Sequence, residues 1–280
     1  MTTALRQHRT PLPRRRPARP LPALLTLGAP VPPRAVWLLR AASVLVPFTL
    51  WLLVSEAGWV QAEFLPTPSA TWSAGWEMAK SGQLADDAWA SSSRILWGFG
   101  IATLISVPLG ILMGAYRSAH AALEPVIGIL RYLPASAFIP LLVIWLGIGE
   151  SSKIALLVIG VVFFNTLMTA DVVKVVPRDL RQVSATLGAR QNEILRRVIV
   201  PYALPGILDA LRVNFAVAWN LVVVAELIAA ESGLGYRIAR AGRFLQSDKI
   251  FAVLIVIGMI GLAIDVLLRL LRDRIGRWQP

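Results

Sequence analysis

The stretch from residue 172 to residue 203, VVKVVPRDLRQVSATLGARQNEILRRVIVPYA, is a polar segment between two long apolar runs. Its basic residues far outnumber its acids, with Lys174, Arg178, Arg181, Arg190, Arg196 and Arg197 against Asp179 and Glu193. An excess of Lys and Arg is typical of the cytoplasmic loops of membrane proteins. We therefore expect this segment on the inner side of a bilayer.

Apolar residues recur inside this polar segment at helical spacing. They are Val183, Leu187, Ile194, Leu195 and Val198. The pattern predicts two short amphipathic helices hinged at Gly188, because glycine tolerates the positive φ that a tight turn requires. Pro201 and Pro205 mark the exit into the next apolar run. A merely solvated loop has no need of such an apolar stripe.

The same segment resembles the signature loop of ABC importer permeases, which reads EAA, three residues, G, nine residues, I, any residue, LP. Gly188 and Pro201 match, and Val198 and Val200 occupy the I and L positions. The Glu-Ala-Ala opening is replaced by Gln182, Val183 and Ser184. The resemblance implies coupling helices that dock on a separate ATPase subunit, with the contact residues Gln182, Val183, Ser184, Leu187, Gly188 and Pro201. A basic cytoplasmic loop of some other membrane protein is the alternative for this stretch.

Composition places the chain in a membrane. Of 280 residues 56% are hydrophobic, and the mean hydropathy is +0.64, well above soluble domains. The net charge of +12 would suit nucleic acid, but the basic residues gather at alternate ends of apolar runs, so we expect membrane lipid and no nucleic acid as a partner. There is no cysteine and only His8 and His120 as imidazole ligands, so we expect no disulfide and no metal site.

Residues 1–35 contain seven arginines, many prolines and no acid. Such a segment cannot bury a core, so we predict a disordered basic tail. Its charge favours the cytoplasmic side and contact with anionic lipid.

Six apolar runs follow in a single permease domain, residues 36–280. We expect membrane-spanning helices at about 36–55, 95–116, 126–148, 154–170, 204–229 and 250–268. This predicts an all-α membrane protein with six transmembrane helices and both termini cytoplasmic. Between the first two runs, an amphipathic helix from Thr67 to Gly82 carries Trp72 and Trp76, which suits the outer interface. A hairpin dipping into the membrane at 232–236 stays open as an alternative.

The third run, RYLPASAFIPLLVIWLGIGE at 131–150, resembles the permeases of the nitrate, sulfonate and taurine group. That resemblance implies the type I ABC importer permease fold, a bacterial inner-membrane location and a small oxyanion substrate, such as nitrate, a sulfonate, taurine or bicarbonate. It also implies two ABC ATPase subunits that bind ATP and Mg²⁺, a second permease copy, most simply as a homodimer, and a periplasmic or lipoprotein substrate-binding protein.

The chain has no phosphate loop, no nucleophile elbow and no paired His-Glu metal motif, so we expect neither an enzyme nor a cofactor in this chain. The main rival is an ion-coupled secondary transporter or channel. Such a protein should carry acids or histidines at mid-membrane depth, whereas the acids here lie toward the ends of the runs.

Five residues are candidates for lining a translocation pathway, namely Arg131, Asn165, Trp219, Asn220 and Glu226. A guanidinium suits an oxyanion through paired hydrogen bonds, although an arginine near a span end also reaches the headgroups by snorkelling. For the asparagines, bonding between helices is the alternative to lining. Asp209 and Arg212, three residues apart, are expected to form a local ion pair.

Overall fold

The computed structural model describes residues 30–277, and the regular structure within that range is entirely helical. The chain divides into two compact units, residues 1–53 and 54–280, which we describe separately. The predicted disordered tail lies outside the described residues, except for residues 30–35. Helix α1 (Pro33–Glu56) begins within that remainder. None of its residues is buried, and Trp37, Leu38 and Val44 are each about 70% exposed, as a lipid-facing helix requires.

The first helix that lies wholly in the second unit is α2 (Pro68–Lys80), which the sequence analysis predicts at the outer interface of the membrane. Its predicted start is confirmed, because the Thr67 hydroxyl caps the helix by accepting a hydrogen bond from the Ala70 amide at 3.2 Å. Pro68 occupies the first turn, where the missing N–H is not needed. Trp72 and Trp76 are exposed on this helix, while Met78 is buried.

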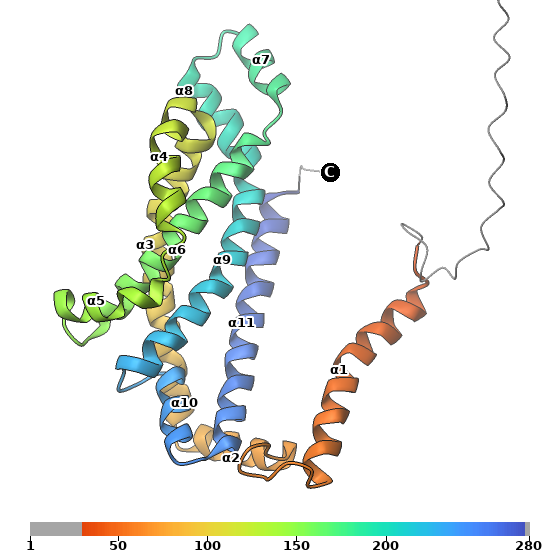
Figure 1. Ribbon diagram of the computed structural model, residues 1–280. Helices are drawn as coiled ribbons and strands as arrows, with labels where there is room; N and C mark the ends of the chain where they lie inside the picture. The colour runs from red at the N-terminus through yellow and green to blue at the C-terminus, as the bar shows by residue number, and fades with distance from the viewer. Residues whose placement is uncertain (1–29, 278–280) are drawn as a thin grey trace, which may run out of the picture. The chain divides into compact units, whose positions relative to one another are not determined.

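The remaining elements run in chain order along this unit. They are α3 (Gln83–Ala115), α4 (Arg117–Leu130), the 3₁₀ turn η2 (Ala135–Phe138), α5 (Ile139–Leu146), α6 (Glu150–Lys174), α7 (Arg178–Thr186), α8 (Gln191–Ile194), the π-helical turn η3 (Leu195–Ile199), α9 (Val200–Ala229), α10 (Leu234–Arg243) and α11 (Ser247–Ile275). Helices α3, α6 and α9 pack against one another, and α11 packs on α9. Figure 1 shows α7 and α8 at one end of this group and α2 and α10 at the other.

The contact between α3 and α6 depends on small residues. Gly98, Ala102, Ser106, Gly110 and Gly114 recur every four residues on one face of α3. A Cβ added at Gly98 would lie 2.6 Å from the Leu157 Cβ, and one at Gly110 would lie 2.6 Å from the Thr166 carbonyl oxygen. This spacing of small residues is typical of membrane helices whose backbones approach closely.

Five helices of the described residues are long and apolar enough to cross a membrane, and a sixth crossing is reached if the bent pair α4 and η2–α5 counts as one. The third predicted span, 126–148, was wrong as a continuous helix, because the two halves of the pair meet at 78°. The cause is Pro134, which has no N–H to offer the Leu130 carbonyl and so ends the helix. Arg131 therefore lies at the end of α4 and not inside a span.

The second predicted span starts too late. Helix α3 begins at Gln83, directly after Gly82 with φ +78°, and so includes three charged residues, Asp86, Asp87 and Arg94, that lie before the predicted start at 95. Both Asp87 and Arg94 are buried, at 4% and 3% exposure. Burying these two charged side chains requires ion-pair or hydrogen-bond partners, which residues of other helices and loops supply.

Candidate functional site

Helix α7 lies at the polar end of the helix group and ends at the predicted glycine hinge. Gly188 has φ +85°. The turn is closed by hydrogen bonds from the Gly188 amide to the Ala185 carbonyl and from the Ala189 amide to the Ser184 carbonyl, both 3.0 Å. A Cβ at Gly188 would meet nothing within 4 Å, so the constraint at this position is conformational and not steric packing.

One face of α7 is apolar and has no partner among the described residues. Leu180, Val183 and Leu187 are 39%, 58% and 82% exposed. Their spacing of three and four residues places them on a single helical face, which we call the α7 stripe. The Ser184 hydroxyl donates to the Leu180 carbonyl at 2.7 Å and so leaves the stripe without a competing polar group.

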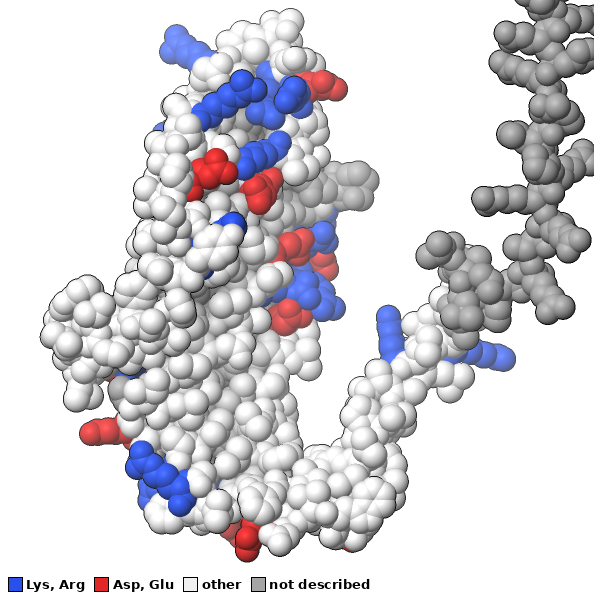
Figure 2. All heavy atoms as spheres, viewed as in Figure 1, with Lys and Arg blue, Asp and Glu red and all other residues white. Residues whose placement is uncertain are grey.

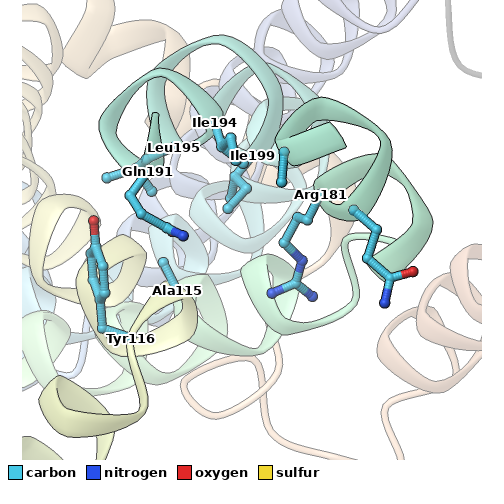
Figure 3. Close-up of a pocket in the computed structure, with 9 residues that line it drawn as sticks. Ala115, Tyr116, Arg181, Gln191, Ile194, Leu195 and Ile199 are labelled. Carbon is cyan, nitrogen blue, oxygen red and sulfur yellow. The ribbon is translucent and has the colours of Figure 1, made fainter. Parts of the chain in front are cut away.

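The other face of α7 borders a cavity of about 230 Å³. Arg181, Gln182 and Ala185 line it from α7, and the joint between α3 and α4 closes it with Ala115 and Tyr116. Figure 3 shows Tyr116 and Gln191 on one side of this hollow and Arg181 on the other. The Arg181 guanidinium donates through Nη2 to the Val176 carbonyl at 2.9 Å. This bond ties α7 to the segment that follows α6.

The second predicted amphipathic helix was wrong as a separate element. Residues 191–228 form one helical run in which α8 passes through the π turn η3 into α9. Ile194 and Ile199 are buried against Val173, Val176 and Ile207. Pro201 lies at the start of α9 and has no N–H to donate to the Arg197 carbonyl, which is consistent with the wider π turn before it. Of the predicted apolar residues, Val183 and Leu187 therefore face outward, whereas Ile194, Leu195 and Val198 anchor the loop.

An ionic cluster centred on the buried Arg94 and Glu226 occupies the opposite end. The Arg94 guanidinium donates from Nη1 to Glu226 Oε1 at 2.6 Å and from Nε and Nη2 to Glu150 at 2.6 and 2.7 Å. It also donates to the carbonyl and hydroxyl oxygens of Ser232 at 2.8 and 2.9 Å. All five N–H groups of Arg94 are thereby used. Glu226 is 1% exposed and also accepts from the Gly235 amide at 2.8 Å.

The loop from Ser232 to Gly235 docks on this cluster because two of its residues have no side chain. A Cβ at Gly233 would lie 2.4 Å from the Glu226 Cδ, and Gly233 has φ +114°. The Gly233 amide donates to Asp87 at 2.9 Å, and Arg237 Nε donates to the same carboxylate at 2.7 Å. The loop that the sequence left open as a hairpin is thus a cap tied to α3 and α9. We call Asp87, Arg94, Glu150, Glu226 and Arg237 the ionic cluster.

At mid-helix depth, Asn165 joins three helices. Its amide donates to the Ser106 hydroxyl at 2.7 Å and accepts from Asn214 at 3.1 Å. Asn165 and Ser106 are fully buried, and Asn214 is 3% exposed. This bridge connects α3, α6 and α9.

Trp219 and Asn220 border a separate cavity of about 210 Å³ between α9 and α11. Asn220 is exposed, and its amide donates to the Ala216 carbonyl at 2.9 Å. Trp219 is 7% exposed, and its indole Nε1 has no hydrogen-bond partner. Arg131 is exposed, and its guanidinium carbon lies 4.9 Å from the Tyr132 ring centroid.

The predicted Asp209–Arg212 pair was wrong. Arg212 pairs with Asp265 of α11, and Asp209 pairs with Arg272 at 3.1 Å. Both acids therefore fasten α9 to α11 rather than to each other. Helical spacing alone cannot distinguish a partner on the same helix from one on a neighbour.

The sequence matches one protein family model over residues 106–277, described as the binding-protein-dependent transport system inner membrane component. The match covers more than half of the chain and includes α7, Gly188 and Pro201. The chain belongs to this family. It is a transport permease and not an enzyme, and its group is that of the nitrate, sulfonate and taurine ABC importers.

Three relatives support this group. The taurine transport system permease protein TauC of Escherichia coli K12 is 35% identical over 86% of this chain and 89% of its own. The putative aliphatic sulfonates transport permease protein SsuC of the same organism is 34% identical over 87% of this chain and 94% of its own. The nitrate import permease protein NrtB of Synechocystis is 30% identical over 63% of this chain and 64% of its own.

Solved permease structures share the fold. An inward-facing form of the MetNI methionine ABC transporter superposes with a TM-score of 0.60 over 71% of this chain and 97% of that chain, at 22% identity. An amino acid ABC transporter with histidines gives a TM-score of 0.55 at 16% identity, over 72% of this chain and 97% of that chain. The all-α prediction and the type I ABC importer permease fold are therefore confirmed.

Most of the ionic cluster was missed by the sequence analysis. Glu226 was singled out, whereas Asp87, Arg94 and Glu150 lie outside the predicted spans 95–116 and 126–148 and were not among the candidates. One signal was available: the two glycines of Ser-Gly-Leu-Gly, 232–235, lie seven and nine residues after Glu226 and permit a close approach to a bulky partner.

Proposed function

We propose that this chain forms the membrane pathway of an ATP-driven importer for a small oxyanion, such as nitrate, a sulfonate, taurine or bicarbonate. Support comes from relatives whose names specify taurine, aliphatic sulfonates and nitrate and which align over most of the chain. The sequence alternative, an ion-coupled secondary transporter or channel, has no support from these relatives.

The proposed assembly has two permease copies, two ABC ATPase subunits and a periplasmic or lipoprotein substrate-binding protein. ATP and Mg²⁺ are bound by the ATPase subunits. Both termini of the permease are cytoplasmic in this proposal, because the α7 end of the molecule is rich in Lys and Arg (Figure 2).

The observation that carries the proposal is the α7 stripe. Three apolar side chains on a short, otherwise polar helix are exposed at the end of the molecule that faces the cytoplasm in this topology. Exposure of this kind on a polar surface marks a site for another protein. The ATPase subunit is the occupant that the family description and the signature loop support.

Coupling follows from the way α7 is attached. The turn at Gly188 connects α7 to the continuous run of α8, η3 and α9, and the buried Ile194 and Ile199 fix that run to the α6 end. A displacement of α7 by the ATPase therefore acts directly on α9, the helix that carries Trp219, Asn220 and Glu226. In this way the pathway alternates between two openings.

For the pathway itself, the donors that border the cavity between α9 and α11 are the best candidates. They are the buried Trp219 indole N–H, which has no partner within the described residues, and the exposed Asn220 amide, and both groups are of the kind that donates to an oxyanion. Arg131 is exposed and offers a fork of donors. Asn165 and Glu226 are buried and bonded to residues of other helices, so we assign them to holding the pathway helices together.

The test is uptake by proteoliposomes. The permease is reconstituted with its ATPase and binding protein, and accumulation of radiolabelled nitrate, taurine, an alkanesulfonate and bicarbonate is measured with ATP or with a non-hydrolysable analogue. We expect accumulation of one of these anions with ATP only. Accumulation by the permease without an ATPase would refute the proposal, and ATP-driven uptake of none of the four would refute the substrate class alone.

A further inference from the structure

A second cleft opens beside α7, on the side facing α4 and the end of α6. Its volume is about 520 Å³. Five basic side chains from three helices line it. They are Arg117 and His120 from α4, Lys174 from α6, and Arg178 and Arg181 from α7. No Asp or Glu is among its lining residues. Figure 2 shows Lys and Arg side chains gathered around a hollow at this end of the molecule.

The positive charge of this cleft is only partly compensated. Lys174 pairs with Asp171 and His120 with Glu124, each at 3.2 Å. Arg117 and Arg178 form no ion pair within the part of the chain that the structure describes. The Nε of Arg181 is buried and has no hydrogen-bond acceptor. A guanidinium N–H that is desolvated without an acceptor is a donor available to an anion.

Helix ends contribute little net charge to the cleft. Helices α4 and α7 begin beside it, at Arg117 and Arg178, while α3 and α6 end beside it, at Ala115 and Lys174. The partial positive charge of the two starts is therefore offset by the partial negative charge of the two ends. The attraction for an anion comes from the uncompensated cations and the unpartnered Arg181 donor around one volume.

The position of the cleft along the membrane helices indicates which ligand it binds. It lies where the apolar helices α3 and α6 end, at Ala115 and Lys174, which is the level of the lipid headgroups. Farther along α4, about 14 and 18 Å from Arg117 by helix rise, Val126 and Ile129 are 56% and 68% exposed and offer an apolar surface for an acyl chain. The cytoplasmic leaflet carries the anionic lipids.

We propose that this cleft binds the phosphate group of an anionic phospholipid from the cytoplasmic leaflet. The inference rests on the orientation given under the proposed function. Because the cations come from α4, α6 and α7, a bound phosphate ties the coupling helix α7 to the ends of the membrane helices. Anionic lipid is then required for full coupling between the ATPase and transport.

The experiment uses the assembled transporter in nanodiscs of phosphatidylcholine, with or without phosphatidylglycerol. Lipid retained after delipidation is counted by native mass spectrometry, and ATPase stimulation by the substrate-loaded binding protein is measured in parallel. The variants are R117Q alone and R117Q/R178Q. The matched control is R240Q/R243Q, which removes the same charge from exposed positions on α10, at the other end of the molecule.

We expect the wild type and the control to retain phosphatidylglycerol, and R117Q/R178Q to retain about tenfold less, with a smaller loss for R117Q. Stimulation of the ATPase should fall in the same order. Equal retention of phosphatidylglycerol by the control and the double variant would overturn the proposal. Retention of phosphatidylcholine by the wild type to the same extent as phosphatidylglycerol would overturn it as well. Displacement of the lipid by inorganic phosphate at millimolar concentration would show a free-anion site instead. If no ATPase copurifies even with the wild type, the proposed function fails, whatever the lipid counts show.

Discussion

Arg94 of α3 and Glu226 of α9 form a buried ion pair with a distance of 2.6 Å between Nη1 and Oε1, and both side chains are almost completely hidden from solvent. Neither residue is close to the other in sequence. Glu150 and Ser232 use the remaining donors of Arg94, so the pair is the centre of a saturated cluster. The loop before α10 is held in place by it.

Removing Arg94 should destabilise the protein strongly. An Arg94→Met variant leaves Glu226 buried without its cation, which costs about 3–5 kcal/mol for a buried pair. We expect a large fall in the melting temperature of the purified permease, followed by intrinsic tryptophan fluorescence. The double variant Arg94→Met/Glu226→Met should recover part of the loss. Equal melting of Arg94→Met and the control Arg240→Met would contradict the structural role of the cluster.

Charge on the α7 stripe should weaken ATPase docking. In Val183→Glu, a carboxylate replaces an apolar contact residue at the centre of the stripe, and we expect the permease to bind its ATPase about 30-fold more weakly, the effect of a hot-spot loss of about 2 kcal/mol. Copurification and surface plasmon resonance measure this. Val175→Glu is the control, because Val175 is 79% exposed but precedes α7. Retention of the ATPase by Val183→Glu at wild-type affinity would rule out the stripe as the docking surface.

Gly188 should tolerate Asn better than Val. The φ of +85° is costly for a β-branched residue and moderately costly for Asn, while added side-chain atoms meet nothing. We expect Gly188→Val to lose about 1–2 kcal/mol in the turn and to uncouple ATP hydrolysis from uptake, with Gly188→Asn near wild type. The ratio of ATP hydrolysed to substrate imported is the measurement. Gly128→Val, at a helical glycine with open space around it, controls for the substitution itself.

The contact of α3 with α6 gives a pair of substitutions on one helix with opposite expected results. Gly98→Ala places a Cβ 2.6 Å from Leu157 and should destabilise by about 1–3 kcal/mol through overpacking. Gly100→Ala meets nothing within 4 Å and should be neutral or slightly stabilising, since alanine favours the helix by up to about 1 kcal/mol. Thermal unfolding in detergent compares the two. Equal melting temperatures would mean that the helices pack less tightly than described.

Arg131 tests the anion pathway. Arg131→Lys keeps the charge but removes the planar fork of donors, so we expect lower uptake with unchanged assembly and ATPase binding. Kinetics of uptake against external substrate concentration provide the readout. Arg274→Lys, at an exposed position in the last turn of α11, is the control. Unchanged uptake kinetics in Arg131→Lys would exclude this residue from the pathway.

Features determined by local sequence were predictable, and those determined by contacts between distant segments were not. The start of α2 at Thr67–Pro68 and the turn at Gly188 each depend on two or three neighbouring residues, and both were predicted. The break at Pro134 was also readable, because an internal proline ends a helix, but the length of the apolar run favoured one span. The partners of Arg94 and Arg212 are separated from them by 50 residues or more. Periodicity of hydrophobic residues contains no information about which charged side chains meet.

The continuous helical run from Gln191 to Ile228 is 38 residues long and so measures roughly 57 Å, nearly twice the thickness of the hydrocarbon layer. Such a rod cannot be confined to the bilayer, and its surplus projects on the side of α7. Tilting it by about 5° displaces one end relative to the other by about 5 Å, which is close to one helical turn. In the proposed mechanism a displacement at Ile194 is therefore transmitted along the rod to Glu226 and the docked outer loop.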